Sequence, residues 1–144
     1  MAFKGGLRRN PLLLFEAIVL AIRVETMLRR RRMDDVRSLS GGTGGLRPVK
    51  PGPDLSPTFQ RAIQLAYRLL PFQPTCLKES MVFCLYRRRR GLPAELRIGV
   101  QKHQGQFGAH AWVEDGEGTV LTDPQEGFSA LGVPQASPDD KATR

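Results

Sequence analysis

The sequence is poor in the residues that build disulfide-linked or metal-bound folds. Its 144 residues include two cysteines and two histidines. Cys76 and Cys84 lie on one predicted helix, where about 12 Å of helical rise would separate them, too far for a disulfide bond. His103 and His110 do not have the spacing of zinc ligands relative to these cysteines. We therefore predict reduced thiols, a cytoplasmic location, and neither a metal nor another cofactor.

Long apolar runs are also missing. The most apolar stretch, residues 12–22, contains Glu16 and spans roughly 18 Å as a helix, against ~30 Å of bilayer hydrocarbon. A signal peptide would need small residues at a cleavage site, and Arg23 follows instead. The glycine run at 41–45 lacks the Lys-Ser or Lys-Thr sequel of a phosphate-binding loop. We therefore expect no membrane span and no nucleotide site.

Acidic residues are scarce in the first third of the chain. The net charge is +8: residues 1–50 carry 11 basic and 4 acidic residues (+7), and residues 51–144 carry 11 and 10 (+1). Nucleic-acid binding would depend on the N-terminal arm and on Arg87 to Arg90, which lack interleaved aromatics or a major-groove module. The arginine run is more simply a solvated helix end. We expect no nucleic-acid partner, and a basic nucleic-acid-binding module remains the non-enzymatic alternative.

Composition divides the chain into four segments. Residues 1–37 form an apolar and basic helical segment that opens at Asn10-Pro11, and because its helix is apolar nearly all round, we expect another protein to cover part of it. Residues 38–57 form a Gly/Pro-rich linker, residues 58–131 the main domain, and residues 132–144 a flexible tail. The main domain begins with a helix capped by Ser56-Pro57, with apolar residues on one side: Phe59, Ile63, Ala66, Tyr67 and Leu70.

The next helix is predicted to open on a cysteine. Pro74 disfavours helix before it, Thr75 can act as the N-cap, and Cys76 then takes the first helical position. A thiol there lies beside unpaired backbone N–H groups and the positive end of the helix dipole, which favour a thiolate. Gly91 is the stop signal. Apolar residues recur on an inward stripe: Leu77, Met81, Cys84 and Leu85.

Three strands are predicted after this helix, so the fold class is α+β, with the cysteine-bearing helix packed on an antiparallel sheet. Residues 95–101 alternate polar and apolar, with Leu96, Ile98 and Val100 inward. Residues 107–114 form the second strand, on which His110 shares a face with Trp112 and Glu114. Residues 119–123 return after a turn.

The predicted hairpin places an acid beside His110. If the turn is a two-residue loop at Gly116-Glu117, His110 faces Asp123 across the two strands, with Cβ atoms roughly 5 Å apart. A carboxylate at that place can hold the imidazole in one tautomer, and a cysteine, a histidine and an aspartate are the groups of a thiol hydrolase or transferase. Asp115, in the turn, and Glu114, roughly 13 Å along the strand, are less suitable.

Three sequence blocks resemble the lasso-peptide leader peptidases, which are transglutaminase-like cysteine proteases. They are Leu70-Pro71-Phe72 with Thr75-Cys76-Leu77 and Ser80, then residues 88–100 (RRRGLPAELRIGV), then Ala109-His110-Ala111-Trp112-Val113-Glu114. The resemblance covers about residues 65–128, and the turn at 115–118 is one residue longer than is usual in that family.

The resemblance implies a transglutaminase/papain-like core and a Cys76, His110 and Asp123 triad that removes the leader from a ribosomally made lasso precursor. The expected partners are the precursor, a small leader-binding protein and a lasso cyclase. We place the backbone N–H of Cys76 and the Gln73 side chain as oxyanion donors. The enzymatic alternative is acyl transfer, in which an amine replaces water.

Overall fold

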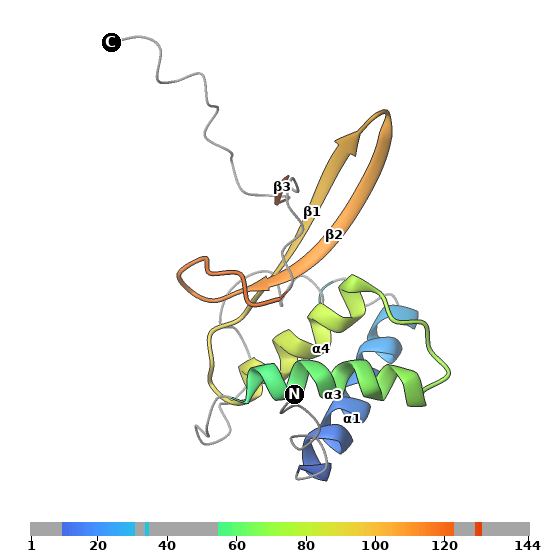
Figure 1. Cartoon of the computed structure of the whole chain (residues 1–144), viewed down its shortest axis with the longest axis vertical. Coiled ribbons are helices and arrows are strands. Elements are labelled where there is room, and N and C mark those ends of the chain that lie inside the picture. Colours follow the sequence, from blue (N-terminus) through green and yellow to red (C-terminus); the bar gives the residue numbers. More distant parts are fainter. Residues whose placement is uncertain (1–9, 31–33, 35–54, 123–128, 131–144) are drawn as a thin grey trace, which may run out of the picture.

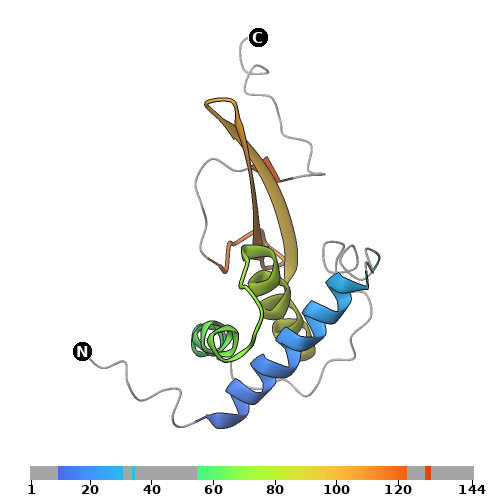
Figure 2. The same cartoon turned by 90° about the vertical axis from the view of Figure 1, so that its right-hand side faces the viewer.

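A computed structural model of the chain describes residues 10–30, 34, 55–122 and 129–130. Within these ranges, three long helices lie beside a sheet whose two long strands extend beyond them (Figures 1 and 2). The helices are α1 (Pro11–Arg29), α3 (Ser56–Leu69) and α4 (Cys76–Arg89), and the strands are β1 (Glu95–His103), β2 (Gln106–Glu114) and β3 (Ser129–Ala130). The fold is therefore α+β, as predicted. Most of the predicted linker and the whole predicted tail lie outside the described residues.

Helix α4 is the centre of the core. It contacts α1, α3, β1 and β2, and every residue from Ser80 to Arg87 is buried. The sequence predicted one inward stripe on this helix, but neighbours on all sides bury a much wider surface. Between α3 and α4, the ring of Phe59 stacks on that of Tyr86 with centroids 3.7 Å apart.

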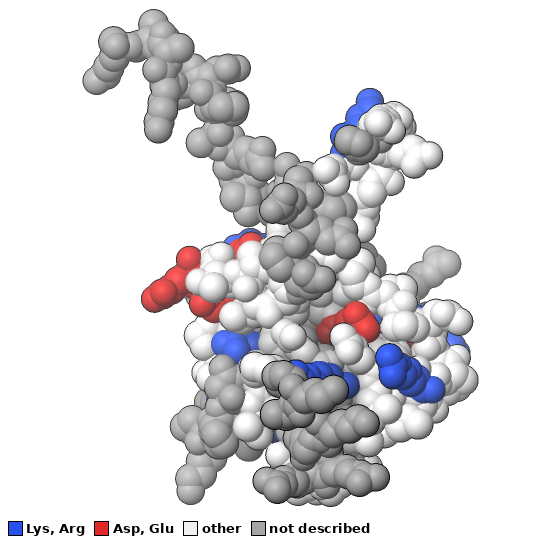
Figure 3. Space-filling model, viewed as in Figure 1, with Lys and Arg blue, Asp and Glu red and all other residues white. Residues whose placement is uncertain are grey.

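The arginine run at the end of α4 is part of the tertiary structure, which corrects the prediction of a solvated helix end. Arg87 is buried, and its guanidinium donates to the carbonyl of Pro93 and the hydroxyl of Ser56. Arg90 donates two hydrogen bonds, of 3.0 and 2.9 Å, to the carboxylate of Glu16 on α1. These side chains tie α4 to its neighbours and are not a free basic surface. On the face shown in Figure 3, acidic and basic side chains are interspersed.

Helix α1 begins at the predicted Asn10-Pro11 and buries only one of its apolar faces. Leu13, Ala17, Leu20 and Val24 pack against α3 and α4. The opposite face carries large apolar side chains that remain exposed: Leu12 (78%), Phe15 (66%), Val19 (43%) and Ile22 (44%). We call these four residues the α1 stripe. In the part of the chain that the structure describes, no helix is long and apolar enough to cross a membrane.

Strands β1 and β2 form a hairpin that extends past the helices (Figure 1). Its two-residue turn, Gln104-Gly105, has φ angles of 48° and 82°, which suit a tight hairpin. Leu96 is buried as predicted, but Val100 is 39% exposed, because the outer half of the hairpin lies beyond the helical core. Strand β3 pairs with β1, so the described sheet has the order β2-β1-β3.

The turn after β2 differs from the predicted two-residue loop. The backbone N–H of Asp115 donates to the carbonyl of Thr119, and Glu114 bridges to Val120. Three residues therefore form the loop, and the last of them, Gly118, has a φ of 83°, as expected where a type I turn is followed by a left-handed residue. The pairing is one residue away from the predicted one, so the register predicted for His110 and Asp123 was wrong.

Candidate active site

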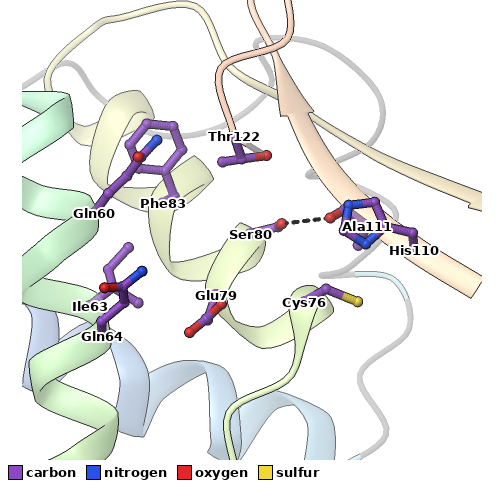
Figure 4. Close-up of a pocket in the computed structure, with 10 residues that line it drawn as sticks. All are labelled: Gln60, Ile63, Gln64, Cys76, Glu79, Ser80, Phe83, His110, Ala111 and Thr122. Carbon is purple, nitrogen blue, oxygen red and sulfur yellow. Dashed lines mark hydrogen bonds between the residues drawn. The ribbon is translucent and has the colours of Figure 1, made fainter. Parts of the chain in front are cut away.

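A cavity of about 130 Å³ lies between α3, α4 and β2. Cys76 and His110, predicted as nucleophile and base, both line it, as does Thr122 from the segment after the turn. Figure 4 shows the imidazole of His110 above the first turn of α4, where the side chain of Cys76 projects. The structure thus brings together two residues that are 34 positions apart in the sequence.

Cys76 is placed by the start of its helix. Thr75 has an extended conformation (φ −135°, ψ 157°), and its hydroxyl accepts a hydrogen bond of 3.3 Å from the backbone N–H of Lys78. This cap confirms the predicted helix start, and Cys76 is the first helical residue. Its side chain is half-buried at the edge of the cavity, so a peptide carbonyl can approach the sulfur beside the positive end of the helix dipole.

His110 is placed by strand β2, and Ser80 joins that strand to α4. The hydroxyl of Ser80, one helical turn after Cys76, donates a hydrogen bond of 3.0 Å to the carbonyl of Ala111, the residue after His110. Ser80 is buried, and this bond fixes the distance between the helix that carries the thiol and the strand that carries the imidazole. The i, i+4 spacing of Cys76 and Ser80 is the one sequence signal that could have indicated this role.

The face of β2 that carries His110 is the predicted one. The rings of His110 and Trp112 stack with centroids 6.1 Å apart, and the indole N–H of Trp112 donates a hydrogen bond of 2.8 Å to the carboxylate of Glu114. Arg97 holds the other carboxylate oxygen of Glu114 at 3.1 Å. Both carboxylate oxygens of Glu114 are therefore engaged by neighbouring side chains.

Asp115 is engaged in the turn. Its carboxylate accepts hydrogen bonds of 2.8 Å from the backbone N–H groups of Thr119 and Glu117, and these bonds lower the pKa of the carboxyl group. Asp115 therefore stabilises the turn in which it was predicted to lie.

Asp123 lies outside the described residues, but the chain leading to it is fixed. The hydroxyl of Thr122 accepts a hydrogen bond from the backbone N–H of Val113. The side-chain amide of Gln60 on α3 donates a hydrogen bond of 2.8 Å to the carbonyl of Leu121. Gln60 and Thr122 both line the cavity, and neither was predicted to belong to the site. No short-range pattern joins Gln60 to residue 121, because the contact spans 61 positions.

Gln73, predicted as an oxyanion donor, lines a neighbouring depression and not the cavity of Cys76 and His110. Its backbone carbonyl accepts from the ammonium group of Lys78. Cys84 is fully buried, and burial raises the pKa of its thiol to about 11. It occupies an apolar core position, as predicted. Among the described residues, no three His, Cys, Asp or Glu side chains are grouped so that they could hold a metal ion.

Comparison with known families identifies the class of protein. The model of the transglutaminase-like superfamily matches residues 17–133, which include most of α1 and the whole of α3, α4, the described sheet and the residues of the cavity. The chain therefore belongs to the transglutaminase-like superfamily, whose members are typically cysteine-dependent enzymes. Searches of the curated proteins and of the solved structures gave no match.

Proposed function

We propose that the protein is a cysteine peptidase that removes the leader from a ribosomally made lasso-peptide precursor. The observation that carries the proposal is the shared cavity, in which Cys76 at the start of α4 and His110 on β2 come together. The family supports a cysteine peptidase or an acyltransferase, and the sequence blocks around Cys76 and His110 supply the likeness to leader peptidases.

The proposed reaction proceeds through a thioester. His110 takes the proton of the Cys76 thiol, and the thiolate attacks the carbonyl carbon of the scissile peptide bond. The C–N bond breaks as His110 returns the proton to the departing amine. Water, deprotonated by His110, then attacks the thioester carbonyl, and collapse of this intermediate releases the new carboxylate and restores the thiol.

Three further groups complete the proposed mechanism. The backbone N–H of Cys76 and the side chain of Gln73 would donate to the oxyanion, the latter after a rotation from the neighbouring depression. Asp123 would orient His110. The position of Thr122 on the cavity wall supports this assignment, because the next residue along the chain can lie no farther than about 3.8 Å from it, measured between Cα atoms.

Product analysis tests this proposal. The purified full-length protein is incubated with the precursor peptide encoded beside it, with and without a leader-binding protein, and the products are analysed by mass spectrometry. We expect two fragments whose masses together equal the precursor plus one water. A product in which the leader is joined to an added amine indicates acyl transfer. An unchanged precursor, with binding of nucleic acid that weakens steeply with salt, supports the non-enzymatic alternative.

The partner proposal uses the α1 stripe. Leu12, Phe15, Val19 and Ile22 follow one another at intervals of three and four residues, so they form one continuous exposed apolar face. Such a face fits a protein partner, and we assign it to the small leader-binding protein that presents the precursor. The lasso cyclase is proposed to act on the released core peptide, with no surface assigned to it.

Replacing the centre of the stripe tests this docking site. We expect Phe15→Asp to weaken binding of the leader-binding protein at least about 10-fold in calorimetry, because a charged group replaces an apolar side chain that the complex would bury. Leu69→Ser is the matched control, since Leu69 on α3 is also exposed (61%) but lies outside the stripe. Equal loss of affinity in both variants, or no loss in Phe15→Asp, would remove the stripe from the proposal.

A further inference from the structure

A second depression adjoins the cavity of Cys76 and His110. It lies between the end of α3, the segment 70–74 and the first turn of α4. Two residues, Gln64 and Glu79, line both hollows. A peptide whose carbonyl reaches Cys76 can therefore place a neighbouring side chain in this second depression.

Glu79 carries a half-buried carboxyl group with no partner. Among the described residues it makes no hydrogen bond or ion pair through its side chain, and burial raises its pKa. Ionisation of the Glu79 carboxyl group, as the pH rises through this raised pKa, therefore lowers the stability of the folded state. Two basic residues, Lys78 and Arg29, pair with Glu25 instead: the ammonium group of Lys78 lies 2.8 Å from one of its carboxylate oxygens, and Arg29 lies 3.1 Å from the other. Figure 4 shows the Glu79 carboxyl group directed away from Cys76 toward α3.

Tyr67 provides a second unpartnered group in the same depression. The residue is only 3% exposed, and its buried hydroxyl has no hydrogen-bond partner in the described part of the chain. Burial raises the pKa of Tyr67, and the negative charges of Glu25 and Glu79 raise it further. Tyr67 and Glu79 line the same depression. Burying a hydroxyl without a partner is unfavourable, so a hydrogen bond from a bound donor would stabilise this group.

We infer that this depression is a subsite for a lysine or arginine side chain of the peptide substrate. Glu79 would supply the carboxylate, and the Tyr67 hydroxyl would accept a second hydrogen bond from the same cation. Apolar residues of the wall, Leu70 and Phe72, would contact the methylene stem. Arg68 also lines the depression but is exposed, so water screens its charge. The inference rests on the proposed function, because it assigns the depression to the substrate of that reaction.

Small probes test the subsite without requiring cleavage. The full-length Cys76→Ala variant, labelled with ¹³C in its glutamate carboxyl groups, is titrated with Nα-acetyl-arginine amide and followed by NMR. Nα-Acetyl-citrulline amide is the control, because it has nearly the same shape without the charge. We expect the arginine probe to shift the Glu79 signal and to bind about 10-fold more tightly than the citrulline probe, as is typical of hydrogen bonds to charged groups.

Two further variants separate recognition from folding. Glu79→Gln is expected to lower the affinity for the arginine probe about 10-fold and leave the citrulline probe unchanged, and Tyr67→Phe to lower it about threefold. Glu117→Gln, which removes an exposed carboxyl group in the turn, should change nothing. Equal affinities for the two probes, or an unaltered arginine affinity in Glu79→Gln, would overturn the subsite. If Glu79→Gln fails to fold, the two probes and Tyr67→Phe still decide.

The two proposals fail separately. Selective arginine binding by a protein that leaves every precursor intact would refute the peptidase and keep a cation subsite. Precursor cleavage without selective arginine binding would refute the subsite and keep the peptidase.

Discussion

Replacing Cys76 with alanine is expected to lower the rate of precursor cleavage by on the order of 10³-fold or more. The thiol is the group that attacks the scissile peptide bond in the proposed reaction, and its loss leaves the oxyanion donors and the binding contacts alone to act. Single-turnover cleavage, followed by mass spectrometry, measures the effect. The circular dichroism spectrum should not change, since Cys76 is half-buried at the edge of the core.

Cys84 is the matched control for this experiment. Cys84→Ala should retain cleavage, because the Cys84 thiol is fully buried and donates only to the carbonyl of Ala94. Iodoacetamide at pH 8 should alkylate Cys76 in the native protein and Cys84 only after unfolding. Full activity in Cys76→Ala would disprove the thioester route.

Burial raises the pKa of Cys84 from 9.0 to about 11. The stability that the protonated Cys84 thiol contributes to the fold is therefore full below pH 9 and is lost as the pH rises through 11.

Replacing Phe59 with alanine is expected to lower the free energy of unfolding by about 3–5 kcal/mol. Phe59 is fully buried and stacks on Tyr86, so the change leaves a cavity between α3 and α4. Urea denaturation monitored by circular dichroism measures the loss. Because α4 carries Cys76, activity should fall at temperatures at which this variant partly unfolds.

Phe107→Ala provides the comparison for the same change at the surface. Phe107 is 77% exposed on the outer part of the hairpin and contacts the ammonium group of Lys102 at 5.4 Å from its ring centre. We expect a loss within about 0.5 kcal/mol. A similar loss in both variants would show that the helices do not form the principal core.

Local sequence signals were sufficient where the chain itself determines the conformation. Thr75 after Pro74 predicted the start of α4, and Asn10-Pro11 predicted the start of α1. The placement of Cys76 at a helix N-terminus therefore followed from the sequence. So did the strand that carries His110, because its polar and apolar residues alternate.

The sequence was insufficient where the outcome depends on distant contacts. Arg90 pairs with Glu16, 74 positions earlier in the chain, and no local pattern indicates that partner. The run Asp115-Gly116-Glu117-Gly118 is compatible with a two-residue or a three-residue loop. The left-handed conformation of Gly118 selects the longer loop, and one residue of difference changes every pair in the ladder.

The exposed end of the β1–β2 hairpin has a practical consequence. Gln104 and Gly105 form its tip, and a Cβ atom added to Gly105 would meet nothing within 4 Å. Loop tips of this kind accept added sequence well, and the tip lies five residues from His110, on the part of the hairpin that extends past the helices. An affinity tag or a fluorescent label inserted between Gln104 and Gly105 should therefore leave the fold intact, which makes this position a handle for immobilising the protein.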